Sequence, residues 1–166
     1  MILGAQIFLN TLVAALCLAC SHSTSYTIDA TGEDESTRTT PSWTGELKLY
    51  KKINFQSLLI TLTFNTANLC FNLACGDIDD DISSASWKGL PLKAYFRGGT
   101  TSLLMFYSGI DCTGVSQGWP SSYEKAPNFG TVEMNDVTSS FMFLQNSTGV
   151  LNGIQSICDY KVRTNS

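Results

Sequence analysis

The sequence contains the same six-residue pattern twice, and this repetition limits the fold more than any other feature. Residues 79–84 read DDDISS and residues 135–140 read NDVTSS, so each has two Asn or Asp residues, two variable positions, Ser or Thr, and Ser. The first hexapeptide begins 29 residues after Tyr50 and the second begins 28 residues after Tyr107. Two copies in matching phase indicate an internal repeat, which predicts one domain built from two similar halves.

Alternation of apolar and polar residues predicts that both halves consist of short β-strands. Leu47 and Leu49 alternate with lysine, and Ile60, Leu62 and Phe64 alternate with threonine, which is the period of a half-buried strand. Helical periodicity of useful length is absent from the domain. Further strands are expected at residues 103–107, 115–119, 131–134, 139–145 and 153–158, with loops at 98–99 and after Pro120. Each hexapeptide is expected to form a junction between a loop and a strand, because an apolar segment follows it. Short strands at this density predict an all-β fold, a sandwich of two sheets.

The first 44 residues predict export followed by a polar arm. Residues 2–20 are almost all apolar and end near Ala19, a small residue suited to a cleavage site, so residues 1–20 are expected to be a signal peptide. A membrane anchor is the alternative, since about 18 apolar residues can span a bilayer. Residues 21–44 are rich in Ser and Thr, which predicts a disordered arm or a pro-segment. The folded domain is expected at 45–162, with halves at about 45–92 and 102–160, in a secreted, extracellular protein.

Composition and charge argue against several partners and reaction types. The net charge is −4 and the Lys and Arg residues are scattered, so no basic surface is expected for nucleic acid or an anionic membrane. The only histidine, His22, lies before the domain, which leaves the domain without a histidine base or triad. We therefore expect that the protein is not an enzyme. Trp43, Trp87 and Trp119 are expected in the core, with a sugar-binding face as the alternative.

Four cysteines remain after the expected leader is removed, and they predict disulfide bonds in an exported chain. Three pairings of Cys70, Cys75, Cys112 and Cys158 are possible, and we favour Cys70 with Cys75 and Cys112 with Cys158. A metal site formed by the cysteines is the alternative. Such a site normally includes a nearby histidine or a CxxC spacing, and neither is present. The tripeptide that begins at Asn146 is a glycosylation sequon, so Asn146 is a candidate glycan acceptor in a secreted protein.

The opening of each half adds a second motif to the hexapeptides. Tyr50 and Phe55 fit the pattern aromatic-x4-aromatic-x-Gly, with Ser57 at the glycine position; Tyr107 and Gly114 fit it, with Cys112 at the second aromatic position. Together with the hexapeptides, this pattern resembles the βγ-crystallin domain over about residues 46–160. The resemblance implies two Greek-key motifs. Ser57 would then have to adopt the left-handed backbone that glycine allows there, and a disulfide at Cys112 would replace an aromatic contact.

The resemblance also implies a calcium site shared by the two hexapeptides. In such domains the hexapeptides lie side by side and form two cation sites, each with oxygen ligands from both motifs. The implied ligands are Asp79, Asp80, Asp81, Ser83, Asn135, Asp136, Val137 through its carbonyl, and Ser139. Ser84 and Ser140 are instead expected to hydrogen-bond the loop that crosses above them. The alternative interpretation is a solvated acidic turn capped by serines, and the matching phase of the two motifs favours calcium.

Two classes of function follow. The first is a secreted calcium-binding protein with a structural or stress-protective role, acting as a monomer with calcium ions as its partners. The second is a secreted pathogen effector or toxin-like protein, including protease-inhibitor-like binding, because the chain resembles crystallin-like secreted proteins of filamentous plant pathogens in its cysteine pattern. Its expected partner is then a host or extracellular protein or glycan. No residue of the sequence separates the two classes.

Overall fold

The computed structural model describes residues 42–96 and 98–158. The expected signal peptide, nearly all of the expected arm and the last four residues of the expected domain lie outside these ranges. Within them, no helix is long and apolar enough to cross a membrane. The strands are β1 (Gly45–Lys52), β2 (Gln56–Phe64), β3 (Cys70–Asn72), β4 (Ser84–Lys88), β5 (Leu103–Gly109), β6 (Thr113–Pro120), β7 (Lys125–Ala126), β8 (Ser140–Leu144) and β9 (Ile154–Ser156). Three short 3-10 helices are η1 (Ile110–Cys112), η2 (Ser121–Tyr123) and η3 (Phe129–Val132).

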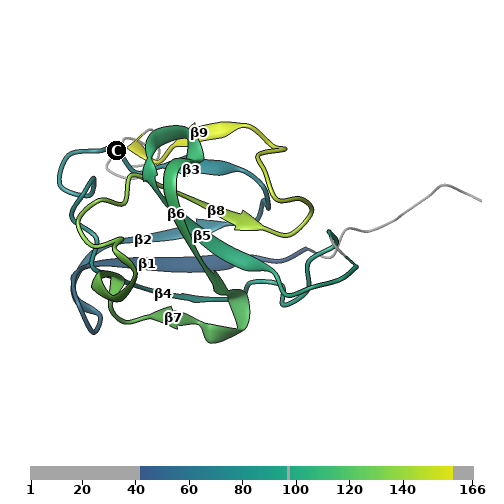
Figure 1. Ribbon diagram of the computed structural model, residues 1–166, viewed down its shortest axis with the longest axis horizontal. Coiled ribbons are helices and arrows are strands. Elements are labelled where there is room, and N and C mark those ends of the chain that lie inside the picture. Colours follow the sequence, from purple (N-terminus) through teal and green to yellow (C-terminus); the bar gives the residue numbers. More distant parts are fainter. Residues whose placement is uncertain (1–41, 97, 159–166) are drawn as a thin grey trace, which may run out of the picture. The chain divides into compact units, whose positions relative to one another are not determined.

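The strands form two sheets, and each half of the chain contributes to both. The first sheet has the order β2-β1-β4-β7 and the second has the order β6-β5-β8-β3-β9 (Figure 1). Strand β3 of the first half therefore lies in the second sheet beside β8, while β7 of the second half lies in the first sheet beside β4. This exchange of one strand per half gives two Greek keys and confirms the expected all-β, two-sheet sandwich.

The core lies between the sheets and is rich in aromatic rings. Leu47 and Leu49 are fully buried on β1 and alternate with partly exposed lysine, as the period of two predicts. All five residues of β8 are buried, because β8 has neighbours on both sides and apolar cover on both faces. Phe141 of β8 stacks on Phe71 of β3 with ring centroids 4.9 Å apart. The crossed strand β3 is thus fixed to the second half by packing as well as by backbone hydrogen bonds.

The three tryptophans pack against the core, as expected. Trp43 contacts the rings of Phe64 and Phe143 edge-on, with centroids 5.7 and 5.1 Å apart, so ordered contacts begin two residues before the expected start of the domain. Trp87 is buried, and its indole N–H donates to the carbonyl of Ser121 at 2.9 Å. Trp119 stacks on a buried phenylalanine. Trp43 and Trp119 nevertheless keep some exposed surface, and Trp43 lines a surface hollow.

The four cysteines all form disulfides, but the expected pairing is wrong. The bonds join Cys70 to Cys112 and Cys75 to Cys158. Strand β9 runs parallel to β3, so the residues that follow each strand leave the sheet at the same end, and this brings Cys75 to Cys158. Cys70 lies within β3 and contacts η1, which carries Cys112. The crossing of β3 between halves therefore decides the pairing, and sequence distance does not.

One expected strand is absent and two short strands were not expected. Residues 131–134 do not form a strand; η3 begins after Asn128, whose side-chain oxygen accepts from the Gly130 N–H at 2.8 Å and caps the helix. Strands β3 and β7 contain only three and two residues. Runs this short are too brief to show a period of two, although they are the strands that cross between the sheets.

Candidate metal centre

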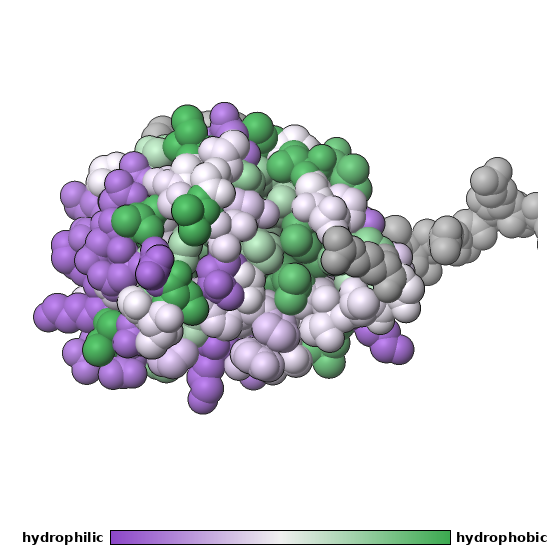
Figure 2. All heavy atoms as spheres, in the orientation of Figure 1, coloured by the Kyte–Doolittle hydropathy of each residue, from purple (hydrophilic) through white to green (hydrophobic). Residues whose placement is uncertain are grey.

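The two hexapeptides occupy matching places at one end of the domain. Each begins in a loop, between β3 and β4 or between η3 and β8, and its last serine is the first residue of β4 or β8. Buried apolar side chains, Ile82 in one loop and Met134 beside the other, anchor the loops to the core. Figure 2 shows hydrophilic side chains gathered at the left end, where Figure 1 places these loops and the turn between β1 and β2.

In the first half, Ser84 fastens the turn between β1 and β2. Its hydroxyl donates to the carbonyl of Lys52 at 2.7 Å and accepts from the backbone N–H of Phe55 at 3.1 Å. The Phe55 ring meets the Tyr50 ring edge-on with centroids 5.7 Å apart, which closes the turn from the other side. The predicted structural role of Ser84 is confirmed.

In the second half, Ser140 makes the equivalent hydrogen bonds. Its hydroxyl donates to the carbonyl of Gly109 at 2.6 Å and accepts from the backbone N–H of Cys112 at 3.1 Å. Cys112 has no aromatic ring to offer, and its disulfide to Cys70 ties the turn to β3 instead. The predicted role of Ser140, and the predicted replacement of an aromatic contact by a disulfide, are both confirmed.

The other serine of each hexapeptide reaches across to the opposite hexapeptide. The Ser83 hydroxyl lies 3.3 Å from Oδ1 of Asp136, and the Ser139 hydroxyl lies 3.2 Å from Oδ1 of Asp80. The backbone N–H of Asp136 also donates to the carbonyl of Ile82 at 3.2 Å, which holds the two loops together. Two pairs of hard oxygen atoms, each pair drawn from both halves, therefore converge at this end of the domain.

The same backbone conformation presents both aspartates. Asp80 and Asp136 hold the second position of their hexapeptides, and both have left-handed backbones, with φ of 54° and 53°. Asp and Asn are among the few residues with a Cβ that adopt this region at modest cost. Asn or Asp is therefore suited to this position for two reasons: it tolerates the left-handed backbone, and its side chain supplies an oxygen atom.

The remaining expected ligands differ in what surrounds them. Oδ1 of Asp79 is buried and has no hydrogen-bond partner among the described residues. Asn135 uses its amide nitrogen to donate to Oδ2 of Asp136 at 2.5 Å, which orients that carboxylate. Val137 is 39% exposed and can offer only its carbonyl. A buried carboxylate oxygen without a donor normally costs free energy, and a bound cation would remove that cost.

Asp81 has a partner that the sequence did not reveal. Its carboxylate lies 2.6 Å from Nζ of Lys51, and this contact raises the pKa of the lysine. The backbone carbonyl of Lys51 also accepts from the Ser83 hydroxyl at 2.8 Å. Lys51 therefore contacts the first hexapeptide in two ways: its backbone carbonyl accepts from Ser83, and its ammonium pairs with Asp81. Its place next to Tyr50, the opening aromatic residue, was the signal in the sequence that could have revealed it.

The donor set suits calcium better than a transition metal. Within residues 42–96 and 98–158, no three His, Cys, Asp or Glu side chains are grouped to hold a metal ion by themselves, so a site here also needs hydroxyl and carbonyl oxygens. The hexapeptides instead offer carboxylate, hydroxyl and carbonyl oxygens, which are the ligands of a hard cation of flexible coordination. The unpartnered oxygen of Asp79 fits the same chemistry. The residues present therefore fit a calcium ion bound between the halves.

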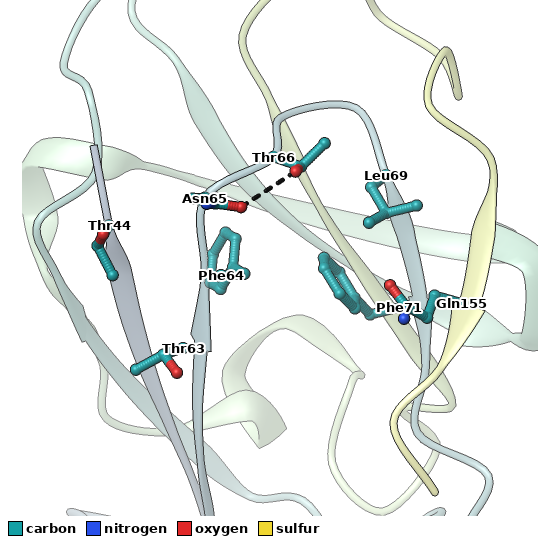
Figure 3. A pocket seen from close by; sticks show the side chains of 8 residues that line it. All are labelled: Thr44, Thr63, Phe64, Asn65, Thr66, Leu69, Phe71 and Gln155. Carbon is teal, nitrogen blue, oxygen red and sulfur yellow. Dashed lines mark hydrogen bonds between the residues drawn. The ribbon is translucent and has the colours of Figure 1, made fainter. Parts of the chain in front are cut away.

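A hollow of about 240 Å³ lies between the end of β2, strand β3 and strand β9, and it shares no residue with the hexapeptides. Figure 3 shows the rings of Phe64 and Phe71 facing this hollow, where the hydroxyl of Thr66 donates to Oδ1 of Asn65 at 3.3 Å. No lining residue is ionisable, so the hollow offers no acid or base. Its lining is Thr44, Thr63, Phe64, Asn65, Thr66, Leu69, Phe71 and Gln155.

Comparisons with known proteins found solved structures that resemble the fold. No protein-family model and no curated protein matches the chain. A structure from work on the evolution of the eye-lens βγ-crystallin domain fold has 17% identity and a TM-score of 0.40, and the match covers 61% of this chain and 87% of that one. A βγ-crystallin from an archaeon has 17% identity, a TM-score of 0.39 and coverage of 60% and 98%. A βγ-crystallin domain from Flavobacterium johnsoniae has 21% identity, a TM-score of 0.38 and coverage of 61% and 97%.

The topology of this chain carries the assignment of its fold. The two halves, with β1 to β4 in the first and β5 to β9 in the second, exchange β3 and β7 between the sheets. The hexapeptides lie at the start of β4 and β8, and Ser84 and Ser140 each fasten the opening turn of their own half. The described domain is therefore βγ-crystallin-like.

Proposed function

We propose that this protein is a secreted calcium-binding protein in which the metal has a structural or stress-protective role. The observation that carries the proposal is the pair of crossed contacts, Ser83 with Asp136 and Ser139 with Asp80. Each contact joins one Greek key to the other. At present each pair is a long hydrogen bond between a serine hydroxyl and an aspartate carboxylate. A cation bound between these two oxygens would attract both of them and so hold the two halves together more strongly.

The chain's own residues divide between two ion positions. Asp136 and the hydroxyl of Ser83 would hold one ion, close to the Lys51 carbonyl that already accepts from Ser83. Asp80 and the hydroxyl of Ser139 would hold the other. The free oxygen of Asp79 and the carbonyls of Asn135 and Val137 are the further donors of the hexapeptides. Calcium itself would supply only positive charge and coordination. Because the oxygens at each position come from both halves, the bound ion would hold the halves together.

The structural role follows from linkage between binding and folding. A ligand that binds only the folded state stabilises it by about 2.7 kcal/mol per site when the free ligand is a hundredfold above Kd. Two such sites would add a large fraction of the stability of a small domain. The disulfides support export, because such bonds persist in oxidising compartments. Asn146 is exposed, so the expected glycosylation is also part of this proposal.

The proposal is tested with the mature chain, freed of calcium by chelator and then dialysed. Isothermal titration with calcium is expected to show two bound ions, and the melting temperature is expected to rise in millimolar calcium and fall again in EDTA. Magnesium serves as the comparison, because it demands stricter octahedral geometry and gives up water reluctantly. A titration without heat, together with a melting curve that does not respond to EDTA, would show that the protein does not bind calcium.

The hollow of Figure 3 favours a second candidate, binding of an extracellular glycan, which is a role open to a secreted effector. Its uncharged hydroxyl and amide groups, set around two nearly buried aromatic rings, suit an uncharged polyhydroxyl ligand. A glycan array probed with the mature chain tests this candidate. Loss of a positive signal in Gln155→Ala, with the signal retained in Gln117→Ala on β6, would place the ligand in the hollow.

A further inference from the structure

A lysine side chain binds the first hexapeptide next to one of the two proposed ion positions. Nζ of Lys51 lies 2.6 Å from Oδ2 of Asp81, in the first hexapeptide. The carbonyl of the same lysine accepts from the Ser83 hydroxyl at 2.8 Å, and that hydroxyl lies 3.3 Å from Oδ1 of Asp136. Lys51 therefore brings a positive charge to the first hexapeptide, and that charge also interacts electrostatically with Asp136, where we propose a dication.

The second half has no equivalent of this ion pair. Ser108 follows Tyr107 as Lys51 follows Tyr50, and its hydroxyl accepts from the backbone N–H of Val115 at 3.0 Å. Val137 holds the position that Asp81 holds in the first hexapeptide. The pseudo-symmetric halves thus differ at two matched positions, and both differences concern charge.

We infer that Lys51 weakens calcium binding at the position of Ser83 and Asp136 and so makes the two sites unequal; this inference rests on the proposed calcium function. Two effects act in the same direction. The ammonium repels the dication directly, and it also occupies the Asp81 carboxylate that would otherwise attract calcium. At an assumed separation of roughly 6 Å in a medium like water, Coulomb repulsion between a unit charge and a dication corresponds to about a tenfold change in affinity.

The ion pair can be removed without harming the fold. The Lys51 side chain is 53% exposed and that of Asp81 is 32% exposed. Exposed pairs of this kind contribute little to stability. Only the backbone of Lys51 takes part in the β1 ladder and in the contact with Ser83. A methionine at this position keeps the length of the side chain and the backbone carbonyl, and removes only the charge.

The test compares Lys51→Met with Lys52→Met by calcium titration of the mature chain. Both variants lose one positive charge at neighbouring positions, but Lys52 is exposed and has no ion-pair partner among the described residues. Lys51→Met is expected to bind one of the two calcium ions about tenfold more tightly, with the other affinity unchanged. Lys52→Met is expected to change either affinity by less than threefold. The double variant Lys51→Met with Asp81→Asn should lose most of this gain in calcium affinity. It removes the Asp81 carboxylate, which Lys51→Met alone leaves without its positive partner.

The outcomes separate the inference from the calcium function. If the wild-type chain binds calcium and Lys51→Met binds it with the same affinities, the inference is wrong and the calcium function stands. If the wild type does not bind while Lys51→Met does, the lysine acts as inferred and the proposed function of the natural chain fails. If neither chain binds, both are overturned. Equal gains in Lys51→Met and Lys52→Met would also reject the inference, since they would reflect net charge alone.

Discussion

The two Greek keys reach the same geometry by different means. In each key a serine at the start of β4 or β8 hydrogen-bonds the opening turn, with donor–acceptor distances of 2.7 Å for Ser84 and 2.6 Å for Ser140. The first key closes that turn with the ring contact of Tyr50 and Phe55, whereas the second uses the disulfide of Cys112. A turn therefore depends on the serine for its shape, while the groups that hold it against the core can be exchanged.

The keys differ again at the backbone position that the family pattern reserves for glycine. Ser57 in the first key has φ of 57°, and Gly114 in the second has φ of 79°. The left-handed backbone is thus kept even where a residue with Cβ must adopt it. The turn geometry is set by the pairing of the strands and the serine contact, and the side chain at this position accommodates to it.

The largest expected effect in this comparison comes from the disulfide of the second key. Replacing both Cys70 and Cys112 by alanine is expected to lower the free energy of unfolding by about 2–4 kcal/mol, because the bond closes a loop with a sequence separation of 42. Urea unfolding of the oxidised protein measures the loss. Mass mapping of the native protein should find no alkylatable cysteine without reduction. A Cys70–Cys75 peptide in that map would contradict the pairing described here.

The next effect tests whether calcium clamps the two keys together. Asp80→Ala should remove up to about 2.7 kcal/mol of calcium-dependent stability in one cooperative transition, because its oxygen meets Ser139 of the other key. Ser139→Ala should weaken the same site as Asp80→Ala, because the two residues supply oxygens to one ion position from opposite keys. The matched control is Ser156→Ala on β9, which is expected to leave binding unchanged. If Asp80→Ala and Ser139→Ala weaken different sites, the halves bind calcium separately.

A smaller effect is expected from the aromatic contact of the first key. Phe55→Ala should destabilise the domain by about 1–2 kcal/mol, since it removes an edge-to-face ring pair and some apolar burial. Phe55→Leu restores most of the burial without the ring and separates the two contributions. Denaturant unfolding at fixed calcium gives both values. A loss as large as that of the disulfide variant would mean that the two keys are closed by contacts of equal strength.

The smallest effect in this comparison is expected at Ser57, one of the two matched left-handed positions. Ser57→Gly should stabilise the domain by up to about 1 kcal/mol, because glycine adopts positive φ without steric cost. Gly114→Ala should do the opposite and cost more than 1 kcal/mol, since its Cβ would also lie 2.6 Å from the Ser108 hydroxyl oxygen. Melting curves of the two variants against wild type decide the signs. A loss of stability in Ser57→Gly would indicate that the serine side chain makes a contact that offsets its backbone strain.

The sequence was informative where a signal is local. The alternation over β1 and β2 predicted those strands, and the hexapeptides marked the starts of β4 and β8, because each pattern is contained in six to nine adjacent residues. Residues 131–134 misled the prediction because apolar content alone does not separate a strand from a short helix. The capping hydrogen bond of Asn128 made the difference there.

The sequence by itself determined that the chain has two matched halves, that they are built from strands, and which oxygen-bearing residues occupy equivalent positions. Only the tertiary structure decided which partners those residues meet. The disulfide pairing, the crossed contacts of Ser83 and Ser139, and the ion pair of Lys51 with Asp81 all depend on segments at least 30 residues apart. Such partners are chosen by the exchange of β3 and β7 between the sheets, and that exchange is set by packing of the whole core.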